Sequence, residues 1–219
     1  MTVCVWIFPK AYFLTRVFLI ISLSGLWLYG IFLLRKLPVS AVSLLSAGLA
    51  IIVFLILPGS EPDQVRLRKE YISVLKRYEG TVYIWGGENK IGIDCSGLVR
   101  NGLIDANVLV GIKTLNPKPI RTALNMWWND CSASALRDGY RNYTKTLFKA
   151  ENINSANIDA MLPGDIAVTV DGVHVLAYLG ENLWIEADPG VMRVILVKTP
   201  TNNPWFTVPV YILRWTQLI

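Results

Sequence analysis

The sequence contains a single histidine, His174, and only three cysteines among its 219 residues. A cysteine nucleophile needs a base to become a thiolate, and histidine is the usual base. Cys95 stands in the run Asp94-Cys95-Ser96-Gly97, shortly after a glycine pair at 86–87. If the chain uses thiol chemistry at Cys95, the scarcity of histidine leaves His174 as the imidazole partner.

Acidic residues are absent from residues 1–60, which carry four basic residues: Lys10, Arg16, Arg35 and Lys36. The remaining 17 basic and 16 acidic residues almost cancel, so the net charge of +5 belongs mainly to this N-terminal segment. A nearly neutral remainder lacks the basic surface typical of nucleic-acid binding, and we expect no nucleic-acid partner. The basic residues beside the apolar runs instead fit contacts with anionic lipid head groups.

Charge is also absent from two long apolar runs, residues 17–34 and 37–60. Crossing a bilayer takes about 20 mostly apolar residues. We therefore predict that residues 1–60 form a membrane anchor with transmembrane helices at about 14–35 and 38–58. A cleaved signal peptide is the alternative for the first run, but that run exceeds the usual apolar region of about 7–15 residues. Cys4 precedes the apolar region, so we expect a free, inert thiol and no lipid attachment.

Two spans place both chain ends on one side of the membrane, and charge alone leaves that side open. The basic turn Arg35-Lys36 is typical of a retained cytoplasmic element. A larger basic group follows the second span, at residues 66–77, and it favours a cytoplasmic location for the remaining domain.

Residues 61–219 are enough for one domain with its own core. Apolar residues at helical spacing predict a first helix over 64–78, followed by an extended stretch at 81–85. A second helix is predicted over about 96–106, which places Cys95 at a helix start. Amide groups and the helix dipole favour negative charge there, so we expect the thiol pKa to fall below its usual value of about 8.5.

A mostly helical insertion is predicted at about 110–160, with helices over 120–136 and 140–148. Cys131 lies in this segment among small and aromatic residues, and we expect an ordinary packed cysteine.

Strand patterns replace helical ones after Leu162-Pro163-Gly164-Asp165. Five strands are predicted, at 166–170, 173–179, 183–187, 191–197 and 208–215. Asp171-Gly172 is a strong hairpin signal, so the first two strands should be antiparallel neighbours with His174 at the start of the second. Helices followed by a block of antiparallel strands indicate an α+β domain.

A carboxylate partner for the histidine is predicted on the next strand. Glu186 lies twelve residues after His174, where a hairpin would bring it alongside the imidazole. A carboxylate in that place could hold the imidazole in one tautomer and stabilise its charged form. Asp188 lies two residues along, on the same face of the strand, and is the second candidate.

Taken together, these motifs resemble those of the NlpC family of papain-like cell-wall endopeptidases, over about residues 64–215. The resemblance rests on four motifs, in chain order Tyr-x-Trp-Gly-Gly from Tyr83, Asp-Cys-Ser-Gly-Leu-Val from Asp94, Pro-Gly-Asp from Pro163, and His-Val-x-x-Tyr-Leu-Gly from His174. It implies a papain-like catalytic domain that needs no cofactor and no metal.

By this resemblance, Cys95 is the nucleophile, His174 the base and Glu186 the third polar residue, a position where histidine is commoner in the family. Tyr83 matches a tyrosine that binds substrate or helps to stabilise the oxyanion. Asp94 and Ser96 match positions that hold the free amino end of a stem peptide in some members.

The implied substrate is the peptidoglycan stem peptide, cut between D-glutamate and a diamino acid. The implied location is the cytoplasmic membrane of a bacterium, with the domain on the periplasmic or extracellular side and residues 1–60 in contact with lipid. Two alternatives stay open: an amidase or acyltransferase of the same fold that acts on a non-wall or lipid substrate, and an inactive binding module.

Overall fold

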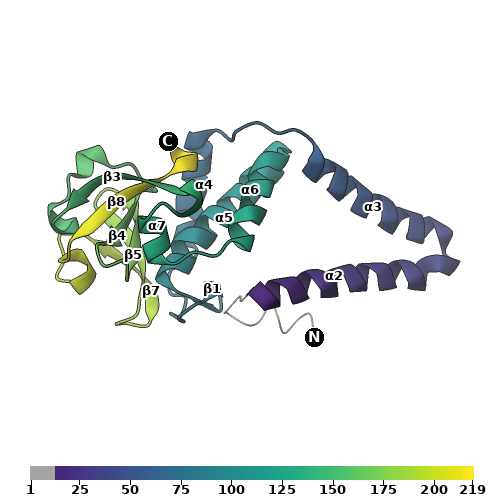
Figure 1. Ribbon diagram of the computed structural model, residues 1–219, viewed down its shortest axis with the longest axis horizontal. Coiled ribbons are helices and arrows are strands. Elements are labelled where there is room, and N and C mark those ends of the chain that lie inside the picture. Colours follow the sequence, from purple (N-terminus) through teal and green to yellow (C-terminus); the bar gives the residue numbers. More distant parts are fainter. Residues whose placement is uncertain (1–12) are drawn as a thin grey trace.

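Two apolar helices project as a hairpin from the rest of the chain (Figure 1). The computed structural model describes residues 13–219, so the predicted inert thiol Cys4 lies outside the described residues. Helix α2 spans Phe13–Leu33 and α3 spans Pro38–Ile56, with the turn η1, Leu34–Lys36, between them. At 1.5 Å per residue each helix is about 30 Å long, which matches the hydrocarbon thickness of a bilayer.

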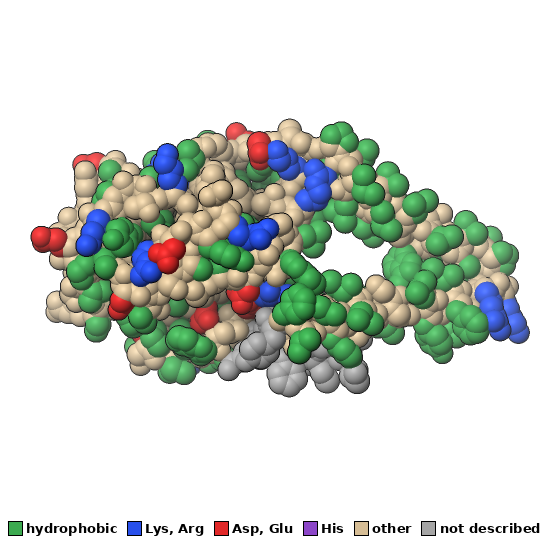
Figure 2. All heavy atoms as spheres, in the orientation of Figure 1, with side chains coloured by type: hydrophobic (Ala, Val, Ile, Leu, Met, Phe, Trp, Pro, Cys, Tyr) green, Lys and Arg blue, Asp and Glu red, His purple; other side chains and the backbone are tan. Residues whose placement is uncertain are grey.

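The surface of this hairpin is apolar along both helices (Figure 2). Its basic side chains in the turn, Arg35 and Lys36, lie at the end farthest from the body of the molecule. Both helices are long and apolar enough to cross a membrane by length and composition. The predicted bounds of 14–35 and 38–58 agree with the helix bounds, and membrane crossing itself stays a prediction.

The body is built on one six-stranded antiparallel sheet with the strand order β3-β8-β4-β5-β6-β7. Its strands are β3 (Thr144–Ala150), β4 (Ile166–Thr169), β5 (Val175–Gly180), β6 (Leu183–Asp188), β7 (Arg193–Lys198) and β8 (Val210–Trp215). A separate small hairpin pairs β1 (Glu88–Asn89) with β2 (Gly92–Ile93) directly before Asp94. Helices with an antiparallel sheet confirm the predicted α+β class.

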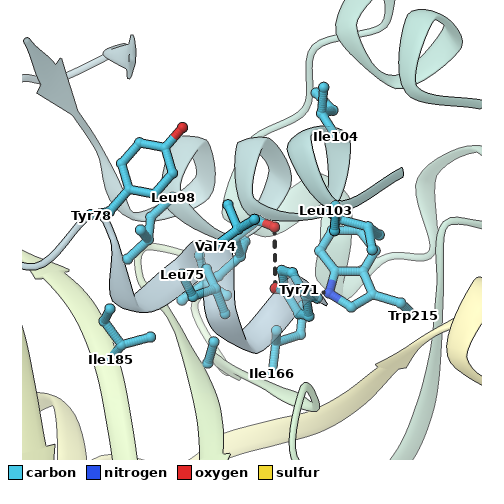
Figure 3. Close-up of a cluster of buried hydrophobic side chains, with 14 of the residues drawn as sticks. Tyr71, Val74, Leu75, Tyr78, Leu98, Leu103, Ile104, Ile166, Ile185 and Trp215 are labelled. Atoms are coloured by element: carbon cyan, nitrogen blue, oxygen red, sulfur yellow. Dashed lines mark hydrogen bonds between the residues drawn. The ribbon is translucent and has the colours of Figure 1, made fainter. Parts of the chain in front are cut away.

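Four helices accompany the sheet: α4 (Gln64–Lys76), α5 (Cys95–Thr114), α6 (Pro117–Trp128) and the short α7 (Ala133–Arg137). Helix α5 is central, since it packs against α4, α6 and the β5–β6 part of the sheet. Figure 3 shows apolar side chains of α4 and α5 meeting Ile166, Ile185 and Trp215 of the sheet. The core therefore holds the start of α5 in a fixed position against the sheet.

Secondary structure differs from the prediction in the segment after α5. The helix predicted over 140–148 is wrong, because Thr144–Ala150 is strand β3, paired antiparallel with β8. That pairing joins residues 60 or more positions apart, and local spacing cannot reveal it. The predicted helix over 120–136 is broken at 129–132, where Asn129 ends α6 and Ser132 caps α7. Helix α5 also continues to Thr114, well beyond the predicted end at 106.

The hairpin turn predicted at Asp171-Gly172 joins β4 to β5. Gly172 has a φ of +76°, a backbone conformation that residues other than glycine rarely adopt. An added Cβ there would lie 2.7 Å from the Cβ of Ser134. His174 ends this turn one residue before β5, and its carbonyl accepts the Thr169 amide at 3.0 Å. The turn thus fixes the backbone at His174.

Candidate active site

Cys95 is the first residue of α5, as predicted from its place before a helical pattern. Asp94 caps this helix by accepting a hydrogen bond from the Gly97 amide at 2.6 Å. An added Cβ at Gly97 would lie 2.3 Å from the Gly87 carbonyl oxygen, so glycine is required for the first turn of α5 to pack on that loop. The order of loop, cap and helix in this chain therefore has a steric cause.

The thiol pKa is raised, which contradicts the predicted lowering. Burial raises the pKa of Cys95 to about 12, and the charge of Asp94 acts in the same direction. The backbone amides of Val175, Ser96 and Cys95 lower it, as expected at a helix start, but by less than burial raises it. The resting thiol is therefore protonated unless a nearby base takes its proton.

His174 is almost fully buried and forms a hydrogen-bonded pair with Glu186, with 2.7 Å between Nε2 and Oε2. The Thr169 hydroxyl accepts the His174 amide at 3.0 Å, and the imidazole stacks on Trp205 with ring centroids 4.2 Å apart. These contacts hold both the backbone and the ring of His174 in one orientation.

Glu186 on β6 is completely buried, and each of its oxygens has a partner. Oε2 contacts His174, and Oε1 accepts a hydrogen bond from Asn203 Nδ2 at 2.8 Å. Burial raises the pKa of Glu186, the contact with His174 lowers it, and the charge of Asp188 raises it again. The buried carboxylate is thus placed to stabilise a charged imidazole beside it.

Asp188, the second candidate for contact with His174, has other partners. Its Oδ1 accepts the Gly190 amide at 2.6 Å, and its Oδ2 lies 3.3 Å from Asn203 Nδ2. Asn203 therefore bridges the two carboxylates of β6, and Glu186 is the one that contacts the imidazole.

The Cys95 thiol lies against the backbone on both sides of His174. Its Sγ is 3.9 Å from the Val173 carbonyl oxygen, which it can reach as a donor, and the Val175 amide approaches it as well. Residues 95 and 174 are distant in the sequence, and packing of α5 on β5 makes their backbones neighbours.

A pocket of about 390 Å³ opens in front of the thiol. The four sequence-predicted residues Tyr83, Asp94, Cys95 and Ser96 all line it. His174 and Glu186 are buried and do not line it. A molecule bound in this pocket would therefore contact Cys95 but neither His174 nor Glu186.

Asp94 and Ser96 are occupied by contacts within the protein. Asp94 Oδ2 accepts the Gly86 amide at 2.8 Å, and its Oδ1 accepts the Ser96 hydroxyl at 3.0 Å as well as the Gly97 amide. The structure therefore uses Asp94 to join the 86–87 loop to α5. Binding of a substrate amino group by these two residues stays a prediction.

Tyr83 is buried, and its pKa is raised first by burial and then by the charges of Cys95 and Asp94. The phenol therefore stays protonated at neutral pH and can donate a hydrogen bond toward the pocket.

Sequence reasoning missed Asn203, Trp205, Glu88 and Arg100. Asn203 and Trp205 lie in the loop between β7 and β8, which carries no motif, so no local signal identifies them. Glu88 and Arg100 line the pocket and are joined by an ion pair. Arg100 is a charged residue inside the apolar spacing of α5, and that exception was a usable signal of a buried pair.

No group of three or more metal-ligating side chains gathers among residues 13–219. A cysteine at a helix start, packed beside a histidine that precedes β5 and is paired with a carboxylate on β6, is the arrangement of a thiol-dependent hydrolase.

The sequence model of the NlpC/P60 family matches residues 80–213. The chain belongs to the NlpC/P60 family, which confirms the family predicted from the four motifs. No curated protein matches the sequence.

Solved structures similar to this chain include NlpC2 from Trichomonas vaginalis, with 18% identity, a TM-score of 0.44, and coverage of 74% of this chain and 50% of that one. The NlpC/p60 domain of the peptidoglycan hydrolase SagA has 18% identity and a TM-score of 0.40, with 66% and 97% of the two chains covered. The peptidoglycan hydrolase RipB from Mycobacterium tuberculosis has 20% identity and a TM-score of 0.40, with 68% and 65% covered. This chain thus spans about half the length of the first of these proteins.

Proposed function

We propose that this chain is a membrane-anchored, papain-like cysteine peptidase that hydrolyses amide bonds in bacterial peptidoglycan stem peptides. The bond proposed is the one between D-glutamate and a diamino acid, by resemblance to the family. Cys95 is the nucleophile, His174 the base and Glu186 the residue that orients the base.

One observation carries the proposal: Cys95 begins α5, lines the open pocket and contacts the backbone on either side of His174. Burial holds the thiol in its protonated form, so the thiolate has to be made by transfer of its proton to the imidazole. Glu186 Oε2 fixes the Nε2 side of the ring, which leaves Nδ1 as the nitrogen that takes the proton.

Attack of the thiolate on the substrate carbonyl gives a tetrahedral intermediate whose oxyanion accepts the Cys95 amide at the start of α5. Loss of one such donor in comparable sites costs about 2.7–4 kcal/mol of transition-state stabilisation. The imidazolium of His174 then protonates the leaving amine, and an acyl-thioester on Cys95 remains.

A water molecule enters after the amine leaves, and neutral His174 removes its proton as the water attacks the thioester. The carbon–sulfur bond then breaks, the acyl group departs as a carboxylic acid, and His174 returns the proton to the Cys95 thiolate. Glu186 stabilises the charged imidazole in both half-reactions, because its buried carboxylate has no solvent to screen it.

The hairpin α2–α3 is proposed to span the cytoplasmic membrane, in contact with lipid. Its apolar surface and helix lengths support this, and both helices return to the body at one end. The proposed substrate lies outside the cytoplasmic membrane, so the catalytic domain is proposed to lie on the outer side. The basic turn Arg35-Lys36 would then be the cytoplasmic element, as is typical of basic turns.

Digestion of purified stem peptides by the full chain in lipid nanodiscs tests the activity. We expect new amino ends on the diamino acid, and none with Cys95→Ala. Release of a different product from a lipid or non-wall amide would favour an amidase or acyltransferase. No turnover with any of these substrates would favour an inactive binding module.

A reporter fused after Ile219 tests the location. Activity of a periplasmic reporter supports the proposed side, whereas activity of a reporter that works only in the cytoplasm would contradict it and remove access to the wall.

A further inference from the structure

The apolar helix α2 contains one buried residue among those described, Arg16, whose exposed fraction is 3%. Its Nη2 contacts both carboxylate oxygens of Glu88, at 2.7 and 2.8 Å, and its Nη1 donates to the Trp128 carbonyl at 3.2 Å. An arginine near the end of a membrane helix ordinarily extends its side chain to water or lipid head groups. Here the guanidinium is instead engaged by the catalytic domain.

Aromatic contacts fix the same end of α2. The Arg16 guanidinium lies over the Trp127 ring, 5.7 Å from its centroid. Phe13 meets Trp128 edge to face, with centroids 5.2 Å apart. The start of α2 is therefore docked on the end of α6 by polar and aromatic contacts together, which a flexible tether would not need.

Glu88, the partner of Arg16, belongs to the wall of the candidate catalytic pocket. It also pairs with Arg100 of α5, and Arg100 pairs with Asp130 at 2.8 Å. Glu88, Arg100 and Asp130 all line the pocket. A continuous ion network thus runs from α2 to the residues around the Cys95 thiol.

Charge balance in this network depends on Arg16. Burial raises the pKa of Glu88, while Arg100 lowers it, Asp130 raises it and Arg16 lowers it. Without Arg16, Glu88 would keep a single arginine, which it shares with Asp130. A buried carboxylate that loses a partner either takes up a proton or moves toward water. Because Glu88 follows Gly87 directly, such a movement would shift the loop that packs on the first turn of α5.

We propose that Arg16 is a positioning residue of the catalytic pocket, so that the first apolar helix shapes the active site in addition to attaching the chain to the membrane. The inference rests on the proposed function only in treating this pocket as the substrate site. It assigns Arg16 no contact with substrate, and its effect passes through Glu88.

The test uses the full chain in lipid nanodiscs, with Arg16→Gln, Arg16→Lys and the matched control Arg35→Gln. Arg35 is an exposed arginine of the same hairpin, at the turn far from the pocket. Two quantities are measured: the rate of iodoacetamide labelling at Cys95, resolved by peptide mass spectrometry, and KM and kcat for stem-peptide hydrolysis.

We expect Arg16→Gln to change the labelling rate and to raise KM by about ten-fold, equivalent to about 1.4 kcal/mol, with a smaller change in kcat. Arg16→Lys should restore part of the loss, because lysine keeps the charge and loses the two-point contact. Arg35→Gln should match the native chain. Equal labelling rates and KM values for Arg16→Gln and Arg35→Gln would overturn the proposal.

A Glu88→Gln background supplies the second arm and guards against a simple folding defect. With the carboxylate neutralised, the added Arg16→Gln change should alter labelling less than two-fold, by the logic of a double-mutant cycle. An undiminished effect in this background would show that Arg16 does not act through Glu88. Labelling needs no substrate, so a native chain that hydrolyses no peptide would refute the proposed function and leave this test intact.

Discussion

Replacing Glu186 with glutamine would change one charge in the histidine pair without changing its shape. Asn203 donates to Glu186 Oε1, so the glutamine oxygen should take that side and its amide nitrogen should face His174. That nitrogen can only donate, which forces His174 Nε2 to accept and places the ring proton on Nδ1. In that tautomer His174 cannot take the thiol proton.

The expected loss is a fall in kcat of about 10⁴-fold, as found for the equivalent carboxylate-to-amide change in a serine protease triad. At 1.36 kcal/mol per ten-fold change, this corresponds to about 5 kcal/mol of transition-state stabilisation. Hydrolysis of stem peptide by the chain in nanodiscs measures it, and Asp188→Asn is the matched control because Asp188 contacts Gly190 and Asn203 but not the imidazole.

Stability separates this effect from misfolding. Burial raises the pKa of Glu186 above its usual value of 4.5, so its ionised form costs folding free energy as the pH rises past that value. Glutamine has no such cost, and the melting temperature of Glu186→Gln at pH 7 should equal or exceed that of the native chain. A kcat within ten-fold of native in this folded variant, or an equal loss in Asp188→Asn, would refute the reasoning.

Three further outcomes follow from the same contacts. In His174→Ala, burial keeps the Cys95 pKa at about 12, so the rate of iodoacetamide labelling should rise about ten-fold per pH unit from pH 7 to 10. A labelling rate that levels off below pH 9 would contradict this expectation. Trp205→Ala removes the ring stacked on His174 and should lower kcat about ten-fold, whereas Trp205→Phe should retain most activity in the same assay. Tyr71→Phe removes the buried hydroxyl that accepts the Trp215 indole N–H, and it should lower the free energy of unfolding by about 1–3 kcal/mol in a urea titration. An unchanged free energy of unfolding would show that this contact does not stabilise the fold.

Elements with strong local patterns could be predicted from the sequence. Apolar spacing identified α4, long uncharged apolar runs identified both hairpin helices, and turn residues such as Asp171-Gly172 separated β4 from β5. The helix predicted over 140–148 was wrong because residues 144–150 become a strand only through their partner β8, far along the chain. Local spacing identifies elements that carry their own apolar face and misses those defined by a distant neighbour.

The site shows the same division. Cys95, His174 and Glu186 could be chosen because each lies at a predictable position on a helix start or a strand. The thiol pKa could not be inferred, since a helix start suggests lowering and only the packed structure shows how much burial opposes it. Asn203 and Arg16 were missed because their contacts, to Glu186 and Glu88, join segments with no pattern in common.

The central claim is that Cys95 is the nucleophile, and trapping the acyl-enzyme tests it most directly. Stem peptide is mixed with the full chain, quenched in acid during the first turnover, and the protein mass is measured with peptide mapping. The account predicts one acyl adduct, located on Cys95, and no adduct or product with Cys95→Ala. Hydrolysis by Cys95→Ala at the native rate, or an adduct located on Cys131, would contradict it.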